Sequence, residues 1–114
     1  MITVYHNPKC RKSRAGLDYV RKLDKACEVR EYIREGITAG EIRNLVKMLG
    51  VSPFEIVRTQ EDYYKENLKE QVITEDQWYD ILAEFPRLIR RPIVVCNGKA
   101  TIADPPEKAE LVIK

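Results

Sequence analysis

Residues 1–14 read MITVYHNPKCRKSR, and this stretch decides the predicted fold. The apolar, β-branched and aromatic run over residues 2–6 predicts a buried strand that ends at Asn7-Pro8. Residues 11–24 predict a helix, because apolar side chains recur at helical spacing among lysines and arginines. Residues 28–33 alternate loosely with period two and predict a second strand. A β-α-β opening favours parallel strands joined by a right-handed crossover.

Serine and threonine N-caps predict the helices of the middle third. Each cap is followed three residues later by Glu or Gln, and the three caps are Thr38, Ser52 and Thr74. We expect Gly50 to end the first of these helices and Pro86 to end the last. The highly charged segment 59–72 lies between them and is predicted to be partly helical and mobile.

The last third of the chain returns to strands. Residues 92–96 form a short apolar run, Asn97-Gly98 is a strong hairpin signal, and residues 100–102 supply the return strand. Pro105-Pro106 is expected to start a C-terminal helix over residues 107–113. The whole pattern predicts an α/β fold in a single domain, residues 1–114, with a helical insert at about 38–85.

Composition excludes several classes of protein. The net charge of +2 argues neither for nor against nucleic-acid binding, but no apolar run approaches the roughly 18 residues of a membrane span. No signal peptide is visible, so we expect a cytoplasmic protein. Three widely spaced cysteines are a poor disulfide framework and suit a reducing compartment. They also lack zinc-ligand spacing, and with a single histidine we expect no metal site.

Cys10 is the candidate nucleophile. It lies in the turn between the first strand and the first helix, close in sequence to the four cations Lys9, Arg11, Lys12 and Arg14. A helix N-terminus and basic neighbours both favour the thiolate, which is the nucleophilic form. The alternative is a buried structural cysteine, but such a residue needs no proline, polar turn or cations beside it. Ser13 either donates a hydrogen bond to this thiolate or is simply polar in the first helical turn.

The chain resembles the arsenate reductase family, the glutaredoxin-coupled ArsC type, which has the Spx-like regulators as relatives. Three pieces carry the resemblance: YHNPKC at 5–10 with Ser13-Arg14, LIRRPIVV at 88–95, and GVS at 50–52 leading to Arg58. The resemblance implies a thioredoxin-like fold, in which βαβ and ββα units form a mixed four-stranded sheet around the helical insert.

The resemblance also implies a reaction. The Cys10 thiolate would attack an oxyanion, and glutathione with glutaredoxin, or another low-molecular-weight thiol, would resolve the adduct. We expect no bound cofactor, glutathione as co-substrate, no direct contact with nucleic acid or membrane, and a monomer. Ser13 stands where a C-x-x-C motif has its second cysteine, so resolution needs an external thiol unless Cys27 or Cys96 reaches Cys10.

Further site residues follow from the same resemblance. Arg91 would present its planar fork to the oxyanion, and Pro92 after it would have a cis peptide bond. Arg90, by contrast, is expected to be solvated surface charge. Arg58 would close over the oxyanion from the insert, or is one exposed helix charge among many.

Two residues of the turn complete the set of expected site residues. His6 would tune the thiolate electrostatically, or would hydrogen-bond at the strand end. Asn7 is expected to form the turn and to orient Cys10.

One residue departs from the family pattern. Asp104 stands where arsenate reductases of the family carry a third arginine, and a carboxylate there would repel an oxyanion. Asp104 also has a structural interpretation as an N-cap before Pro105. Three functions therefore stay open: an arsenate reductase-like enzyme, a reductase of the same mechanism acting on another thiol-linked substrate, and a non-catalytic Spx-like regulator that binds RNA polymerase. Ser13 speaks against the last, because those regulators usually carry the C-x-x-C pair.

Overall fold

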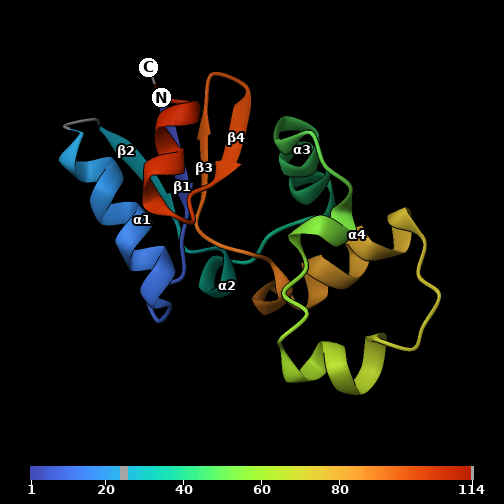
Figure 1. Ribbon diagram of the computed structural model, residues 1–114. Helices are drawn as coiled ribbons and strands as arrows, with labels where there is room; N and C mark the ends of the chain where they lie inside the picture. Colours follow the sequence, from blue (N-terminus) through green and yellow to red (C-terminus); the bar gives the residue numbers. More distant parts are fainter. Residues whose placement is uncertain (24–25, 114) are drawn as a thin grey trace. The chain divides into compact units, whose positions relative to one another are not determined.

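The computed structural model describes residues 1–23 and 26–113, and they form two compact units (Figure 1). One unit is built from Met1–Glu35 and Arg91–Lys114, and the other from Gly36–Arg90. The expected helical insert, about 38–85, falls within the second unit. Each unit is described by itself below.

The first unit contains a four-stranded sheet. Its strands are β1 (Ile2–Tyr5), β2 (Cys27–Arg30), β3 (Ile93–Cys96) and β4 (Lys99–Ile102). They lie in the order β2-β1-β3-β4, with β2 parallel to β1 and with β3 antiparallel to both β1 and β4. The predicted α/β class and the mixed four-stranded sheet are therefore confirmed.

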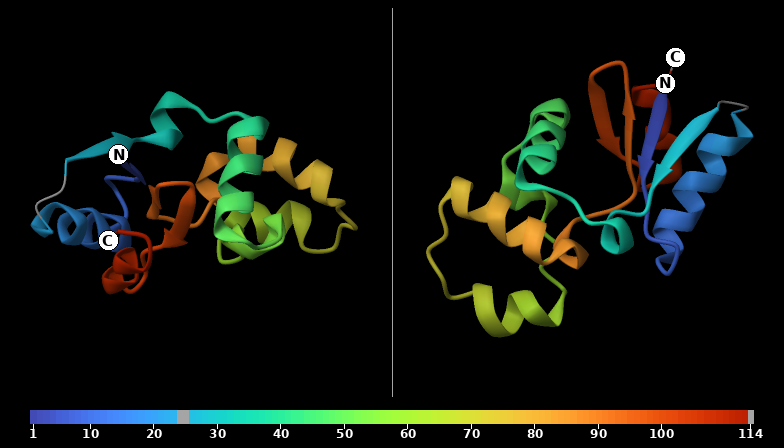
Figure 2. Two further views of the ribbon diagram at one scale, coloured as in Figure 1. Left: turned by 90° about the horizontal axis from the view of Figure 1, so that it is seen from above. Right: turned by 180° about the vertical axis from the view of Figure 1, so that it is seen from behind.

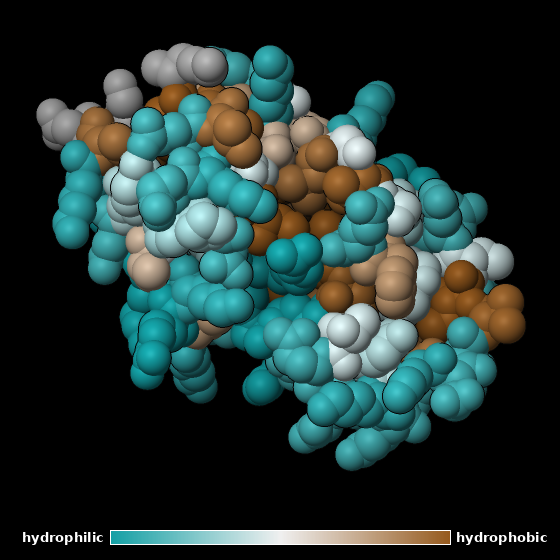
Figure 3. All heavy atoms as spheres, in the orientation of Figure 1, coloured by the Kyte–Doolittle hydropathy of each residue, from teal (hydrophilic) through white to brown (hydrophobic). Residues whose placement is uncertain are grey.

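Two helices pack on one face of this sheet (Figure 2). They are α1 (Arg11–Lys22) and the C-terminal 3₁₀ helix η4 (Pro106–Leu111). Their shared core with the strands consists of Ile2, Val4, Leu17, Val20, Val94, Cys96, Ala103, Ala109, Val112 and Ile113. The outer face of α1 is hydrophilic (Figure 3), because its basic residues alternate with the buried ones at helical spacing. The core thus holds α1, and with it Cys10, against the sheet.

The hairpin between β3 and β4 has the predicted turn. Asn97 and Gly98 adopt positive φ angles of 52° and 77°, which a two-residue hairpin loop requires. The hairpin brings residues 99–102 back along β3 and leads the chain toward Asp104.

The second predicted strand, 28–33, is wrong in its last part. β2 ends at Arg30, and Tyr32–Glu35 form the short helix α2. The Glu35 N–H donates to the Glu31 carbonyl at 2.9 Å, and the Glu35 carboxylate pairs with Arg30 at 2.6 Å. Tyr32 is fully buried, with its ring centroid 6.4 Å from that of Tyr5. Tertiary packing of the aromatic ring therefore overrides the local alternation.

The predicted ends of two helices also differ from the structure. The C-terminal helix expected over 107–113 is the 3₁₀ helix Pro106–Leu111. The first helix, expected over 11–24, ends at Lys22 with Leu23 as its C-cap, and residue 24 lies outside the described residues.

The second unit is helical. Its elements are α3 (Ala39–Leu49), the 3₁₀ helix η1 (Pro53–Ile56), the π-helix η2 (Tyr64–Leu68), α4 (Glu75–Glu84) and the 3₁₀ helix η3 (Pro86–Leu88). The three predicted N-caps, Thr38, Ser52 and Thr74, are confirmed. Thr38 Oγ1 accepts from the Glu41 N–H at 3.1 Å, and the N–H groups of Ser52 and Thr74 each donate at 2.8 Å to the acidic or amide side chain three residues on. The π-helix confirms partial helicity within 59–72.

The core of this unit is apolar and lies mainly between α3 and α4. Its fully buried side chains include Ile42, Leu45, Ile56, Leu82 and Leu88. Over the part of the chain that the structure describes, no helix has the length and apolarity needed to cross a bilayer.

Candidate functional site

The turn after β1 places Cys10 at the start of α1. Cys10 is the N-cap residue, with an extended backbone at φ −100° and ψ 123°. Its N–H donates to the Asn7 carbonyl at 3.0 Å, while the Lys9 N–H donates to Asn7 Oδ1 at 3.1 Å. Asn7 therefore forms the turn, as predicted, and sets the direction of the Cys10 backbone. Arg14 Nη1 donates to the Pro8 carbonyl at 2.8 Å and ties the turn to the helix.

The Ser13 hydroxyl serves this turn. Ser13 is fully buried, its Oγ accepts from the Asn7 N–H at 2.9 Å, and the same atom lies 2.7 Å from Nδ1 of His6. The expected hydrogen bond from this hydroxyl to the thiolate is absent from the interactions of the described residues. The Ser13 contact that favours the thiolate comes from its backbone N–H.

His6 is buried at the end of β1, where its backbone N–H donates to the Arg30 carbonyl at 2.8 Å. Burial lowers the pKa of its imidazole, and the charges of Arg21 and Arg14 lower it further. Glu31 and the Ser13 hydrogen bond oppose this shift without cancelling it. His6 is therefore neutral at pH 7, and its Nδ1 has the Ser13 hydroxyl as partner in either tautomer.

The surroundings of Cys10 favour its thiolate form. Partial burial acts to raise the pKa of its thiol, but three nearby groups outweigh burial and hold the pKa below its ordinary value. They are the Ser13 backbone N–H, the Arg91 side chain, which adds both a hydrogen bond and its charge, and the Lys12 backbone N–H. The two N–H groups belong to the first turn of α1, where backbone donors have no partner in the helix. Arg91 itself is 8% exposed.

Arg91 is brought to Cys10 by the segment that enters β3. The Arg91–Pro92 peptide bond is cis, as the resemblance to the family implies. Pro92 packs against Gly16 of α1, where a Cβ atom would lie 2.4 Å from Pro92 Cγ. Sequence reasoning missed Gly16, although a glycine inside a helical pattern is a signal of close packing.

Asp104 forms an ion pair beside the same helical turn. Its Oδ2 lies 3.1 Å from Lys12 Nζ, and the N-cap of the C-terminal 3₁₀ helix is Pro105. The interpretation of Asp104 as an N-cap is therefore wrong. Its carboxylate instead neutralises a cation in the first turn of α1, the turn that stabilises the Cys10 thiolate.

Cys27 and Cys96 lie at the other end of the sheet from Cys10. Both are paired in register with Ile2, on β2 and β3 respectively, whereas Cys10 follows the Tyr5 end of β1. The step from Ile2 to Tyr5 along β1 spans roughly 10 Å. The Cα atoms of a disulfide must lie within about 7 Å of each other, so this span is too long for one. All three cysteines are free. An internal resolving thiol for Cys10 is therefore excluded in this arrangement.

Arg58 and Arg90 belong to the second unit, on two segments that pair with each other. The Arg58 N–H donates to the Leu88 carbonyl at 2.7 Å, and the Arg90 N–H donates to the Ile56 carbonyl at 2.9 Å. The Arg58 side chain is 19% exposed and forms an ion pair with Glu61. Arg90 is exposed and its Nη1 donates to the Glu55 carbonyl at 3.3 Å.

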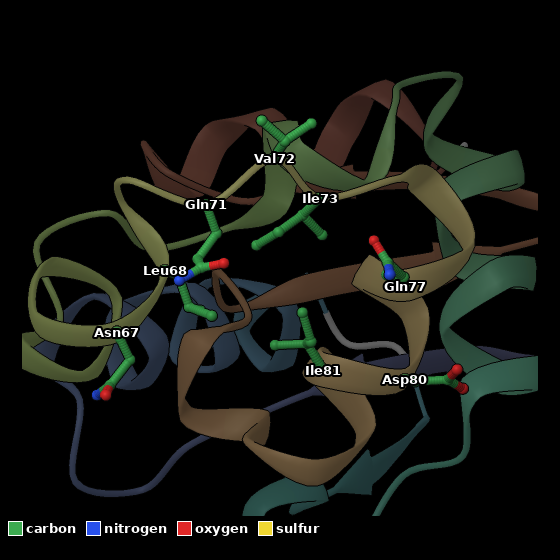
Figure 4. Close-up of a pocket in the computed structure, with 8 residues that line it drawn as sticks. All are labelled: Asn67, Leu68, Gln71, Val72, Ile73, Gln77, Asp80 and Ile81. Carbon is green, nitrogen blue, oxygen red and sulfur yellow. The ribbon is translucent and has the colours of Figure 1, made fainter.

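The second unit also contains an open pocket of about 380 Å³ (Figure 4). Leu68, Ile73 and Ile81 line its apolar part, with Gln71, Gln77 and Asp80 nearby. None of the site residues predicted from the sequence lines this pocket.

The arrangement around Cys10 suits nucleophilic attack on an anion. The Cys10 thiol, two helix N–H donors and a buried guanidinium converge at one end of the sheet. Such donors stabilise negative charge on the sulfur before attack and can hold an oxyanion afterwards.

The chain is similar to several known proteins over nearly its full length. The "Uncharacterized protein YfgD" of Escherichia coli (strain K12) is 40% identical over 109 residues, 94% of this chain and 92% of that protein. An arsenate reductase of Neisseria meningitidis is 34% identical over 114 residues, 98% of this chain and 97% of that protein. The structure of an arsenate reductase from Vibrio cholerae superposes with a TM-score of 0.93 at 37% identity, covering 98% of this chain and 97% of that one.

The family model described as "ArsC family" matches residues 5–111, which include the Cys10 turn, the whole of the second unit and the C-terminal 3₁₀ helix. The chain therefore belongs to the ArsC family, as an arsenate reductase-like protein with a thioredoxin-like α/β fold.

Proposed function

We propose that the protein is a monothiol oxidoreductase in which Cys10 attacks an oxyanion and an external thiol resolves the adduct. The observation that carries this proposal is the set of groups that lower the pKa of Cys10: the N–H groups of Ser13 and Lys12 and the side chain of Arg91. The absence of a second thiol near Cys10, which follows from the strand register, supports an external reductant.

The reaction with arsenate has a balanced course. Cys10 Sγ forms a bond to arsenic, and a protonated oxygen leaves as water. The thiolate of glutathione then attacks Cys10 Sγ, the sulfur–arsenic bond breaks, and its electron pair leaves with arsenic, which is reduced from As(V) to As(III). The two sulfurs are oxidised to a Cys10–glutathione disulfide, which glutaredoxin reduces to free Cys10.

The other site residues have supporting roles in this proposal. Arg91 offers its N–H fork to the oxyanion and stabilises the thiolate, and Arg58 is proposed as an anion-binding residue of the second unit. His6 and Asn7 hold the turn through the Ser13 hydroxyl. The protein needs no bound cofactor for these steps. Its partners are glutathione or a similar thiol and glutaredoxin, in the reducing environment of the cytoplasm.

A second candidate is the same monothiol chemistry on a thiol-linked substrate, such as a glutathione mixed disulfide. The Lys12–Asp104 ion pair favours it, because the carboxylate opposes the binding of an anion near the first turn of α1. Replacing Asp104 by Arg separates the two candidates. If arsenate is the substrate, the Asp104→Arg variant reduces arsenate faster than the wild type. Unchanged arsenate reduction, with retained activity on glutathione mixed disulfides, supports the second candidate.

The main test is an arsenate reduction assay with glutathione and glutaredoxin. Wild type should turn over, Cys10→Ser should be inactive, and Cys27→Ser should match the wild type. The rate of Cys10 alkylation is measured against pH in parallel. A Cys10 thiol that titrates at an ordinary value near pH 8.5 contradicts the proposal. Recovery of RNA polymerase in a pull-down, with both activities absent, would point instead to a regulator of the Spx-like kind.

A further inference from the structure

Arg58 and Arg87 converge on one carboxylate in the second unit. Glu61 Oε2 forms an ion pair with Arg58 Nη1, and Glu61 Oε1 lies 3.8 Å from Arg87 Nε. The side chains of Arg58 and Glu61 are 19% and 17% exposed, so this pair is largely shielded from water, whereas Arg87 is 73% exposed. Shielding makes a charge pair stronger than one on the open surface.

The Arg58 guanidinium keeps most of its donors. Among the residues that the structure describes, Glu61 is the only hydrogen-bond or ion-pair partner of the Arg58 side chain, through Nη1. A guanidinium carries five N–H donors in a planar fork that fits two oxygens of a carboxylate or of a tetrahedral oxyanion. Glu61 therefore occupies part of a donor set that would also hold an anion.

The ion pair is not needed to hold the chain at this point. The backbone of Arg58 is fixed by its N–H bond to the Leu88 carbonyl at 2.7 Å and by the antiparallel bridge between Val57 and Ile89. The Glu61 N–H donates to the Arg58 carbonyl at 3.2 Å and closes the turn through main-chain atoms. The carboxylate of Glu61 can thus move away from Arg58 without loss of these bonds.

We propose that Glu61 is an internal counter-ion of Arg58 that competes with an oxyanion ligand and so sets the affinity and selectivity of this arginine. The ligand class is a tetrahedral oxyanion, such as arsenate or phosphate, and the inference rests on the proposed function in taking Arg58 as an anion-binding residue. In the free protein Glu61 neutralises Arg58. When an oxyanion binds, it replaces the carboxylate at Nη1, and Glu61 turns toward solvent beside the exposed Arg87. Anions too weakly charged to displace the carboxylate are excluded.

The experiment is a titration of the full-length protein with inorganic phosphate at constant ionic strength, followed by NMR through the Arg58 side-chain Nε–H and the backbone amides of residues 58–61. In Glu61→Gln we expect the affinity for phosphate to rise about fivefold, because a like charge roughly 4 Å from the anion is removed. Glu66→Gln is the matched control: it makes the same change in net charge at an exposed position of the neighbouring π-helix and should leave the affinity unchanged. Arg58→Gln should abolish the gain in the Glu61→Gln background.

Three results would overturn the inference: phosphate affinity in Glu61→Gln equal to or weaker than in the wild type, an equal gain in Glu66→Gln, or no phosphate-dependent shift at residues 58–61 in either protein. Glu61→Ala, which also removes the carboxylate, is the second variant should Glu61→Gln fail to fold. The alkylation profile of Cys10, measured in the same variants, tests the proposed thiol chemistry separately. An ordinary Cys10 pKa would remove the proposed function while leaving the phosphate result to decide the role of Glu61.

Discussion

The Oγ atom of Ser13 lies 2.7 Å from Nδ1 of His6, and both side chains are buried. The same Oγ accepts the Asn7 N–H at 2.9 Å. Position 13, where a dithiol protein of this fold would have its second cysteine, is thus used to build the turn that holds Cys10. The turn that carries the candidate nucleophile Cys10 is thus supported by a buried polar network.

Loss of the Ser13 hydroxyl should affect stability more than thiol reactivity. Ser13→Ala leaves the Asn7 N–H without its acceptor and His6 without its partner, so we expect the free energy of unfolding to fall by about 1–3 kcal/mol. The pKa of Cys10 should stay low, because the backbone N–H of residue 13 remains. Urea denaturation and the pH profile of alkylation measure the two quantities. Ser52→Ala, which removes a hydroxyl at an exposed cap, is the control and should lower the free energy of unfolding by less.

Arg91 should control the reactivity of Cys10. Arg91→Gln removes a charge and a hydrogen bond that lower the pKa of the thiol, so the alkylation profile should move to higher pH. Turnover should fall about tenfold or more, equivalent to about 1.4 kcal/mol. Arg90→Gln makes the same charge change on the preceding residue, which is exposed and bonds the Glu55 carbonyl. If the two variants shift the alkylation profile of Cys10 equally, the pKa of the thiol responds only to net charge and not to the Arg91 contact.

His6 should make the protein less stable in acid. Burial holds its pKa below the unfolded value of 6.5, so the unfolded chain binds a proton that the native state does not. The free energy of unfolding therefore falls as the pH drops below about 6.5. Because His6 is the single histidine of the sequence, the loss of stability between pH 7 and 5.5 should be smaller in His6→Gln than in the wild type. If both proteins lose the same free energy of unfolding between pH 7 and 5.5, the pH dependence comes from carboxylates and not from His6.

Release of Lys12 from Asp104 should favour anionic reagents at Cys10. In Asp104→Asn the ratio of the alkylation rate with iodoacetate to that with iodoacetamide should rise about twofold to fivefold, and salt should reduce the effect. Asp18→Asn removes the same charge from an exposed position on α1 and is the matched control. A ratio that rises equally in both variants would mean that the ion pair has no special influence.

The two remaining cysteines should be dispensable for the chemistry. Cys27 and Cys96 share the register of Ile2, at the end of β1 remote from Cys10. The Cys27→Ser and Cys96→Ala variants should turn over as the wild type does, and the oxidised wild type should contain no disulfide between Cys10 and either residue. Mass spectrometry of the oxidised protein tests this directly. A Cys10–Cys27 or Cys10–Cys96 bond would refute the monothiol mechanism.

The features that could be predicted from the sequence are those made by residues close together in the chain. The N-caps at Thr38, Ser52 and Thr74 form hydrogen bonds to groups three residues away, and the Asn97-Gly98 turn depends on its own two φ angles. The strand predicted over 28–33 is wrong in its last part because those residues depend on a contact with a distant part of the chain. Its last residues are helical because the Tyr32 ring is buried beside Tyr5, a contact that local alternation cannot express.

By itself, the sequence determined the α/β class and the strand-to-helix turn, and it marked Cys10 as the candidate nucleophile, because helix N-termini, turn residues and nearby cations act over a few residues. Only the tertiary structure decided which groups surround that thiol. The sheet carries Arg91 to Cys10, pairs Asp104 with Lys12, turns the Ser13 hydroxyl to His6 and holds Cys27 and Cys96 at the far end. These placements depend on strand order and register between segments distant in the chain, and the burial of a common core selects that register.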